Sequence, residues 1–427
     1  MLDAVAVPPS LPFGQPEGAV QSLAAQGFLF ATGIENGAPT VRNGQRRDQF
    51  SETGFHRRWR EDFALARELG CGFLRYGPQL HATLRGPAWY DWSFADETFA
   101  ELRRQGLVPI VELCRFGVPD WIGDFQNPEF PDLFAAYARA FARRFPWVRL
   151  YTPVNGMAVT ALRSARHGWW NERRTDDRSY VTAIRNLVRA NLLAMRAILE
   201  ARPDVIFIGS EPAERFHPEC PRARPHAELR NAERFLALDL CYGRRVCSSM
   251  YEFLLDNGMA RADYHFFLRQ DDLRRHCGLG TEWHATNEQV IGADGSGRWT
   301  GEVLGYGAVA REYHERYRLP LMLTGTSVDQ GPDGDEAERW LWKQWSGLMR
   351  LRQSGVPVLG FAWHSLTDQV DGDTALREAK GRVNPRGLFD LDRRIRPAGR
   401  AYQRLVAEWG EALRREESWL RLPLAAA

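Results

Sequence analysis

The sequence is poor in lysine, in net charge and in cysteine motifs. Lys343 and Lys380 are the only lysines among 56 basic residues, and the formal net charge of the 427-residue chain is +2. A protein this close to neutrality has no broad positive field, so no nucleic-acid partner is expected. The six cysteines are scattered without the C-x-x-C spacing of a zinc or redox site. We therefore expect free thiols in a reducing cytoplasm, with no metal and no cofactor.

The sequence also lacks a long hydrophobic run. No apolar stretch approaches ~18 residues, the length that a membrane-spanning helix needs, so no membrane partner is expected. The N-terminus has no basic start followed by an apolar segment, which argues against a signal peptide. Residues 1–24 are interpreted as an N-terminal extension and residues 416–427 as a C-terminal tail of one domain.

What the chain does contain is a regular alternation of short apolar segments and amphipathic stretches. The apolar segments are rich in Val, Ile, Leu and Phe without polar alternation, as parallel strands covered on both faces are. Eight such strands with helices between them predict a single-domain (β/α)8 barrel, with long βα loops at the C-terminal face. The predicted strands are 27–32, 72–77, 108–114, 148–154, 204–210, 277–283, 319–325 and 356–363.

Two of these strands end in a residue without a side chain. YTPVNG ends in Asn155 and Gly156, and LPLMLTG ends in Gly325. Strand ends at this face are where barrel enzymes carry their catalytic groups. Other strand ends and the loops after them carry polar or aromatic side chains, which are Glu35, Asn36, Arg75, Arg115, Glu282, Trp283, His284, Trp363, His364 and Asp371.

Several of these stretches, in this order, resemble glycoside hydrolase family 1. TPVN after strand four and LT-x-T after strand seven look like the acid/base and nucleophile motifs, while FLFATGIENG, FGVPDW and FAWHSLTDQVDG resemble other segments of that family. The resemblance implies a barrel that binds a small-molecule glycoside or sugar-derived ligand. It places the two catalytic carboxylates at positions 156 and 325, where this chain has Gly156 and Gly325.

The two glycines remove the chemistry that the resemblance implies. A retaining glycosidase needs two carboxyl groups roughly 5 Å apart, one to attack and one to transfer a proton. Glycine can neither exchange a proton nor form a glycosyl ester. Double-displacement hydrolysis is therefore not expected from this chain, and its status as an enzyme stays open.

The resemblance also implies roles for other residues. Arg75 matches the group that supports the nucleophile, Asn155 the contact to the sugar 2-hydroxyl, and Asp371 the sugar-binding carboxylate of the last loop. Glu35 and Asn36 fall in the first substrate-binding segment, while Trp363 and His364 end the last strand. The chain departs from the family at Arg115, at Gly372 and at Trp283-His284, where the family has His, Trp and Tyr.

The departures leave two interpretations of the remaining polar groups open. Glu282 and His284 either form an acid/base pair that replaces the lost chemistry, or are a structural carboxylate and a hydrogen-bonded histidine. Arg115 either points into the pocket, which would favour an anionic ligand, or pairs with Glu112 or another acid. Replacing two Glu and one Trp by Gly predicts a larger and less acidic cavity.

Three functions follow from these interpretations. The favoured one is natural divergence to a sugar-binding protein with lost or altered chemistry, such as a biosynthetic enzyme, because Arg115 and Gly372 also differ and the strands remain apolar. The alternatives are an engineered inactive variant of a retaining β-glycosidase and a non-catalytic carbohydrate-binding pseudoenzyme. The sequence does not indicate an oligomeric state.

Overall fold

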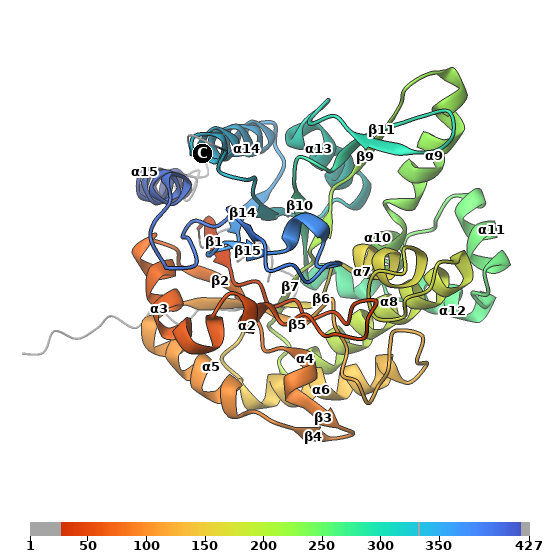
Figure 1. The fold of residues 1–427 in the computed structure, drawn as a ribbon, viewed down its shortest axis with the longest axis horizontal. Coiled ribbons are helices and arrows are strands. Elements are labelled where there is room, and N and C mark those ends of the chain that lie inside the picture. Colours follow the sequence, from red (N-terminus) through yellow and green to blue (C-terminus); the bar gives the residue numbers. More distant parts are fainter. Residues whose placement is uncertain (1–26, 332–333, 420–427) are drawn as a thin grey trace, which may run out of the picture.

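Eight parallel strands close into a barrel at the centre of the molecule, and helices surround it (Figure 1). The structure is a computed structural model that describes residues 27–331 and 334–419. The strand order is β13-β14-β1-β2-β5-β6-β7-β10, and the pairing of β10 with β13 closes the ring. The strands are β1 (Leu29–Gly33), β2 (Phe73–Tyr76), β5 (Val108–Arg115), β6 (Leu150–Asn155), β7 (Ile206–Ile208), β10 (Cys277–Trp283), β13 (Leu321–Thr326) and β14 (Val358–His364).

All eight predicted strands are present, so the single-domain (β/α)8 barrel is confirmed. The largest difference is at β7, which has only three residues where the sequence predicts 204–210. The chain beyond β7 forms a separate short strand, β8 (Glu211–Pro212), which pairs with β10 at Thr281 and Glu282. Through this second pairing, the segment that follows β7 stays beside the C-terminal half of β10.

The helices form because their apolar residues recur at helical spacing and their ends are capped. In α8 (Asp177–Ala201) the predicted stripe of Val181, Ile184 and Val188 is buried, and the side chain of Asp176 accepts a hydrogen bond from the backbone of Ser179. The other helices between barrel strands are α3 (Phe55–Glu68), α5 (Ser93–Gln105), α6 (Phe130–Arg144), α13 (Tyr306–Tyr317) and α14 (Glu336–Gln353).

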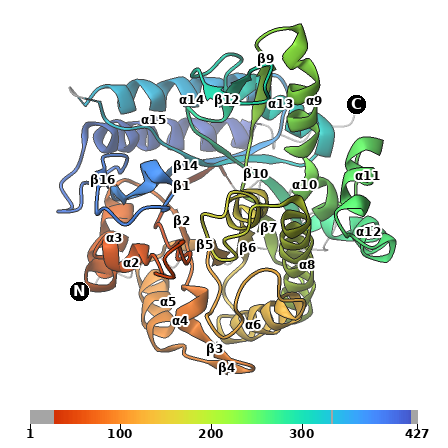
Figure 2. The same ribbon diagram turned by 45° about the vertical axis from the view of Figure 1, so that its right-hand side comes forward.

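The last helix, α15 (Pro397–Trp419), lies beside α14 (Figure 2). It extends through residues 416–419, which the sequence assigned to a C-terminal tail. The rest of that tail, residues 420–427, and the N-terminal extension 1–24 lie outside the described residues. No helix in the described part of the chain is long and apolar enough to cross a membrane.

The core has an inner and an outer layer. The outer layer fills the space between strands and helices with aromatic and branched side chains. The inner layer closes the interior of the barrel with small and branched apolar side chains. Because this interior is packed, the polar chemistry is left to the ends of the strands. The inner residues are Leu29, Ala31, Ile110, Leu150, Ile206, Ile208, Met322, Leu359 and Ala362.

The segments after the strands are long, as predicted, and several contain structure of their own. After β6 come α7 (Met157–Ala161) and a π-helix, Leu162–Arg166. Strands β9 (Arg215–Pro218), β11 (Glu288–Ile291) and β12 (Gly297–Trp299) form a separate sheet, which projects from the barrel with α9 (Arg224–Glu233) (Figures 1 and 2). These segments place polar side chains around the ends of the strands.

One buried ion pair fixes the chain before α15 to α3, and it generates a prediction. Arg393 donates to both oxygens of Asp62 at 2.7 and 2.8 Å, and both side chains are buried. Asp62→Ala leaves a buried guanidinium without its counter-charge, so it should lower the free energy of unfolding by about 3–5 kcal/mol. Urea denaturation measures this loss. The matched control is Glu61→Ala, which removes an exposed partner of Arg58 and should cost below about 1 kcal/mol. Equal losses would contradict the prediction.

Candidate active site

The two glycines at the strand ends are connected through one serine. The backbone N–H of Gly156 donates to the carbonyl of Ser210 at 2.9 Å, and the Ser210 hydroxyl lies 2.9 Å from the hydroxyl of Thr324, which precedes Gly325. Gly325 pairs with Glu282 across β10 and β13. The two glycines therefore border one centre at the C-terminal end of the barrel.

The two glycines differ in whether they can accept a side chain. Gly156 has φ of 60°, in the left-handed region, and a Cβ there would lie 2.7 Å from Cγ1 of Val159. At Gly325 a Cβ would meet Arg75, Glu282 and His364 at ordinary contact distances of 3.4 to 3.5 Å. Position 325 thus faces the centre and is lined by atoms on three sides.

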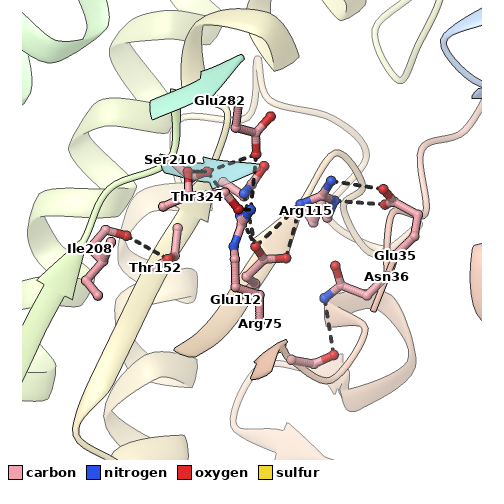
Figure 3. A network of polar contacts seen from close by, with 12 residues as sticks. Glu35, Asn36, Arg75, Glu112, Arg115, Thr152, Ile208, Ser210, Glu282 and Thr324 are labelled. Carbon is pink, nitrogen blue, oxygen red and sulfur yellow. Dashed lines mark hydrogen bonds and ion pairs between the residues drawn. The ribbon is translucent and has the colours of Figure 1, made fainter. Parts of the chain in front are cut away.

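A chain of alternating charges crosses the centre (Figure 3). Arg75 from β2 donates to the carboxylate of Glu112 on β5. Glu112 accepts from Arg115 at 3.2 Å, and Arg115 donates to both oxygens of Glu35 at 2.8 and 2.9 Å. All four residues are buried. The fixed fork of a guanidinium matches a carboxylate in such a bidentate pair, which makes this chain geometrically specific.

Arg115 is thus neutralised on both sides, which decides between the two interpretations that the sequence left open. The sequence left open whether it points at an anionic ligand or pairs with an acid, and the structure places it between Glu35 and Glu112. The neighbouring carboxylates raise its pKa although burial opposes this. Arg115 therefore offers no free charge to an anionic ligand.

Glu282 lies where β10 is distorted and faces the centre. The register between β10 and β13 shifts between Thr281 and Glu282. Its carboxylate accepts from the Ser210 hydroxyl at 2.9 Å, lies 3.5 Å from Nη1 of Arg75, and keeps 16% of the side chain exposed. Burial would raise its pKa, but the charges of Arg75 and Arg115 outweigh burial and hold the pKa at about 2. Glu282 is therefore ionised near neutral pH.

The two histidines of the predicted site are held in the neutral form. Nδ1 of His284 lies 3.3 Å from the carbonyl of Ser327. Burial lowers the pKa of His284, and burial together with Arg115 and Arg75 lowers that of His364 well below its usual value. The Glu282 carboxylate contacts Ser210 and Arg75, and the His284 ring contacts Ser327, so the two residues do not form a directly hydrogen-bonded acid/base pair.

Several buried polar atoms around the centre have no partner among the described residues. Asn155 donates to Glu112 at 3.1 Å and Asn36 donates to the carbonyl of Gly77 at 3.2 Å, but the Oδ1 atom of each is unpartnered. Nε2 of His364 and Nε of Arg75 are also unpartnered. Buried polar atoms normally have a partner, so this group is available to a ligand or to water.

Three predicted substrate-binding residues lie away from this centre. Trp283 is fully buried, donates to Glu302 at 2.6 Å and packs on Tyr306 of α13. Trp363 is fully buried and donates to the carbonyl of Arg386 at 2.9 Å. Successive residues of a strand face opposite sides, so Glu282 and His364 face the centre while the tryptophans face the helices.

Asp371 is the third residue placed elsewhere. Its carboxylate accepts 2.9 Å hydrogen bonds from the backbone of residues 380, 381 and 382 and from Arg47. The side chain is buried. Asp371 therefore anchors the last loop, and both of its carboxylate oxygens are occupied by hydrogen bonds within the protein.

Sequence reasoning missed Ser210 as a site residue and considered Glu112 only as a partner for Arg115. Ser210 ends the fifth predicted strand and links Arg75, Glu282 and Thr324. A hydroxyl at a strand end carries no distinctive pattern. Glu112 did carry a signal, since it is the one charged residue within the apolar run VPIVELC. Charge inside a buried strand requires a partner, and here it has three.

Comparison with known proteins supports the resemblance at the level of fold. A family 1 β-glucosidase from Thermotoga maritima superposes with a TM-score of 0.76 at 17% identity, covering 90% of this chain and 98% of that one. The same enzyme in complex with deoxynojirimycin gives 0.76 at 18% identity. The chain therefore has the barrel fold of the family 1 β-glucosidases.

A similarity in sequence points to the same group of enzymes. The 6-phospho-beta-glucosidase AscB of Escherichia coli (strain K12) is 27% identical over 169 residues, which are 35% of this chain and 34% of that protein. The match thus spans about a third of the relative's length. No known family profile matches the chain.

Because Gly156 has a left-handed backbone and Gly325 does not, replacing each glycine by alanine should have a different effect on stability. Gly156→Ala should lower the free energy of unfolding by at least about 1 kcal/mol, because φ is positive and the added Cβ would clash with Val159. Gly325→Ala should change it by less, within about 0.5 kcal/mol, because its Cβ would meet only ordinary contacts. Denaturant unfolding of both variants decides the point; a larger loss at 325 than at 156 would refute this account of the site.

Proposed function

We propose that this barrel binds a glycoside or sugar-derived small molecule at the centre between residues 156 and 325, and that retaining β-glycosidase chemistry has been lost or replaced there. The observation that carries the proposal is the group of unpartnered polar atoms on Asn36, Asn155 and His364. A sugar hydroxyl both donates and accepts hydrogen bonds, so it can satisfy such atoms. Enzymes of the same fold bind sugar-like inhibitors such as deoxynojirimycin, which supports the ligand class.

Natural divergence is the origin that we favour over an engineered knock-out. Removing a glutamate side chain by design leaves the surrounding backbone and pairing in place. Here Gly156 has a left-handed backbone that disfavours any side chain, and Arg115 is integrated into an ion chain with Glu112 and Glu35. Changes that fit one another in this way are expected of a site that has been rebuilt as a whole.

Altered chemistry is favoured over a purely binding role because one carboxylate remains poised. Glu282 is ionised, partly exposed and beside Arg75, and its Cγ lies 3.4 Å from where the Cβ of residue 325 would stand. It thus offers a negative charge next to the vacated nucleophile position. A cytoplasmic location remains our expectation, in keeping with free cysteines.

Ligand binding tests the proposal directly. Calorimetry with deoxynojirimycin should show binding to the unaltered protein, because the protonated ring nitrogen of this iminosugar pairs with the Glu282 carboxylate. Glu282→Gln should weaken the affinity at least about tenfold, which is the worth of one charge-assisted hydrogen bond. The control Glu338→Gln alters an exposed partner of Arg404 and should leave the affinity unchanged. No heat with deoxynojirimycin or with a simple β-glucoside up to ~10 mM would refute sugar binding.

Restoring both glutamates separates divergence from engineering. The double variant Gly156→Glu, Gly325→Glu should gain no more than about tenfold in aryl β-glucoside hydrolysis. Residue 156 has no strain-free place for a side chain, and a carboxylate at 325 would face Glu282 while Arg75 is already bound to Glu112. Rescue by several powers of ten, measured with a nitrophenyl glucoside, would instead support an inactivated laboratory variant.

A further inference from the structure

Two charged side chains near the centre have no ion pair, unlike the chain of Arg75, Glu112, Arg115 and Glu35. Arg163 lies on the π-helix Leu162–Arg166, with its guanidinium 5.0 Å above the ring of Trp170. Glu214 follows β8. Within residues 27–331 and 334–419, neither charged group has a hydrogen bond or a partner within ion-pair distance. π-helical turns often occur at functional sites, which makes this pair a candidate for ligand contact.

The backbone brings Glu214 to the side of Glu282. Pro212 of β8 pairs with Glu282 of β10, and the next residue, Ala213, donates its N–H to the carbonyl of Glu282 at 3.0 Å. The backbone N–H of Glu214 then donates a hydrogen bond to the hydroxyl oxygen of Tyr313 at 3.1 Å. The main chain of Glu214 is thus held in place directly after Ala213, the residue that contacts Glu282. The carboxylate of Glu214 takes no part in these hydrogen bonds.

Arg163 acts on both carboxylates through its charge. Glu214 and Glu282 both favour the charged form of Arg163 and oppose the effect of burial on its pKa. Within residues 27–331 and 334–419, Arg163 forms an ion pair with neither of them. The carboxylate of Glu214 is therefore under the influence of a positive charge and still able to bind a ligand.

The neighbouring Glu211, unlike Glu214, has a carboxylate that is fully hydrogen-bonded. Its two carboxylate oxygens accept hydrogen bonds from the backbone N–H groups of Met157 and Ala158, directly after Gly156. Burial raises its pKa to about 8. Both oxygens are therefore occupied in holding the start of α7, whereas the carboxylate of Glu214 has no hydrogen bond or ion pair within the described residues.

We propose that Glu214 is the proton donor of this site, in place of the carboxyl missing at 156, with Arg163 as its positioning residue and Glu282 as the carboxylate that faces the anomeric carbon. This inference rests on the proposed function, because it requires a glycoside as substrate. It goes further by naming acetal hydrolysis as the reaction.

The step balances with water as the co-reactant. Glu214 gives its proton to the glycosidic oxygen as the bond from that oxygen to the anomeric carbon breaks, which releases the alcohol. The Glu282 carboxylate stabilises the positive charge on the sugar. The oxygen of a water then bonds to the anomeric carbon, and the proton of that water returns to Glu214. The products are the free sugar and the alcohol, and the enzyme is regenerated.

The environment keeps Glu214 protonated below neutral pH. Burial is the main cause that raises its pKa to about 7, Glu233 adds to it, and Arg163 and two further arginines oppose it. The acid form is therefore present below pH 7 and is lost as the pH rises through about 7. The charged and titratable groups around Glu214 are Arg163 on the π-helix, Arg230 and Glu233 on α9, Arg234 after it, Glu211 on β8, Tyr180 on α8 and Tyr313 on α13.

Leaving-group dependence tests the proton donor. Phenyl β-glucoside needs protonation of its leaving oxygen, whereas 2,4-dinitrophenyl β-glucoside does not. Glu214→Gln should lower kcat/KM for the phenyl substrate by about 10²–10⁴-fold and for the dinitrophenyl substrate by less than about tenfold. The control Glu338→Gln, at the exposed partner of Arg404, should leave the ratio of the two rates unchanged. The ratio does not depend on how much protein is folded.

The pH profile tests Arg163. With the phenyl substrate the rate should fall above about pH 7. Arg163→Met removes a charge that lowers the pKa of Glu214, so the fall should move to higher pH, and Arg163→Lys should restore it. An unmoved profile would remove Arg163 from this role.

Two outcomes would overturn the assignment of Glu214. Equal losses on both substrates would show that the residue acts on folding or binding alone. An unaltered protein that cleaves neither substrate would exclude a proton donor altogether. In that case, binding of deoxynojirimycin still decides the proposed function separately, because binding without cleavage refutes the role of Glu214 and leaves sugar binding intact.

Discussion

The centre of this barrel depends on the requirement that buried charges be paired. Arg75 is fully buried on β2, and without a counter-charge it would cost several kcal/mol. A carboxylate at 325 would face its guanidinium, since the Cβ position of residue 325 lies 3.4 Å from Nη1. With glycine there, Glu112 and Glu282 take that place. The charge of Arg75 is thus balanced by carboxylates from two other strands, and Arg115 and Glu35 complete the balance.

The fold could be predicted from the sequence because each strand is recognised by its own run of apolar residues. A buried parallel strand must be apolar along its length, and eight such segments appear in the chain. The strand ends also located Arg75, Asn155, Glu282 and His364 at one centre. The direction of a side chain was less accessible, because a one-residue shift turns it to the other face. Trp283 and Trp363 were therefore assigned to the site although they pack under the helices.

Contacts between segments that are distant in the chain were the hardest to predict from the sequence. The carboxylate of Asp371 is occupied by three backbone N–H groups of a loop about ten residues away and by Arg47, which no local pattern reveals. The left-handed backbone of Gly156 was equally hidden, since glycine adopts every region of backbone space. The resemblance implies an acid at position 156, and only the structure shows that the backbone there disfavours a side chain.

How fully each carboxylate is engaged indicates which of them is free for chemistry. Glu112 is surrounded by two arginines and an asparagine, and Glu35 by both arms of Arg115. The Glu282 carboxylate accepts from one serine and lies 3.5 Å from the Arg75 guanidinium. The Glu214 carboxylate has no hydrogen bond or ion pair with a side chain among the described residues. Saturated carboxylates have no lone pair to offer a substrate, so their function is structural. Among the carboxylates around the centre in the described residues, Glu282 on β10 and Glu214 after β8 are therefore the two that the protein's own framework leaves partly or wholly unpaired.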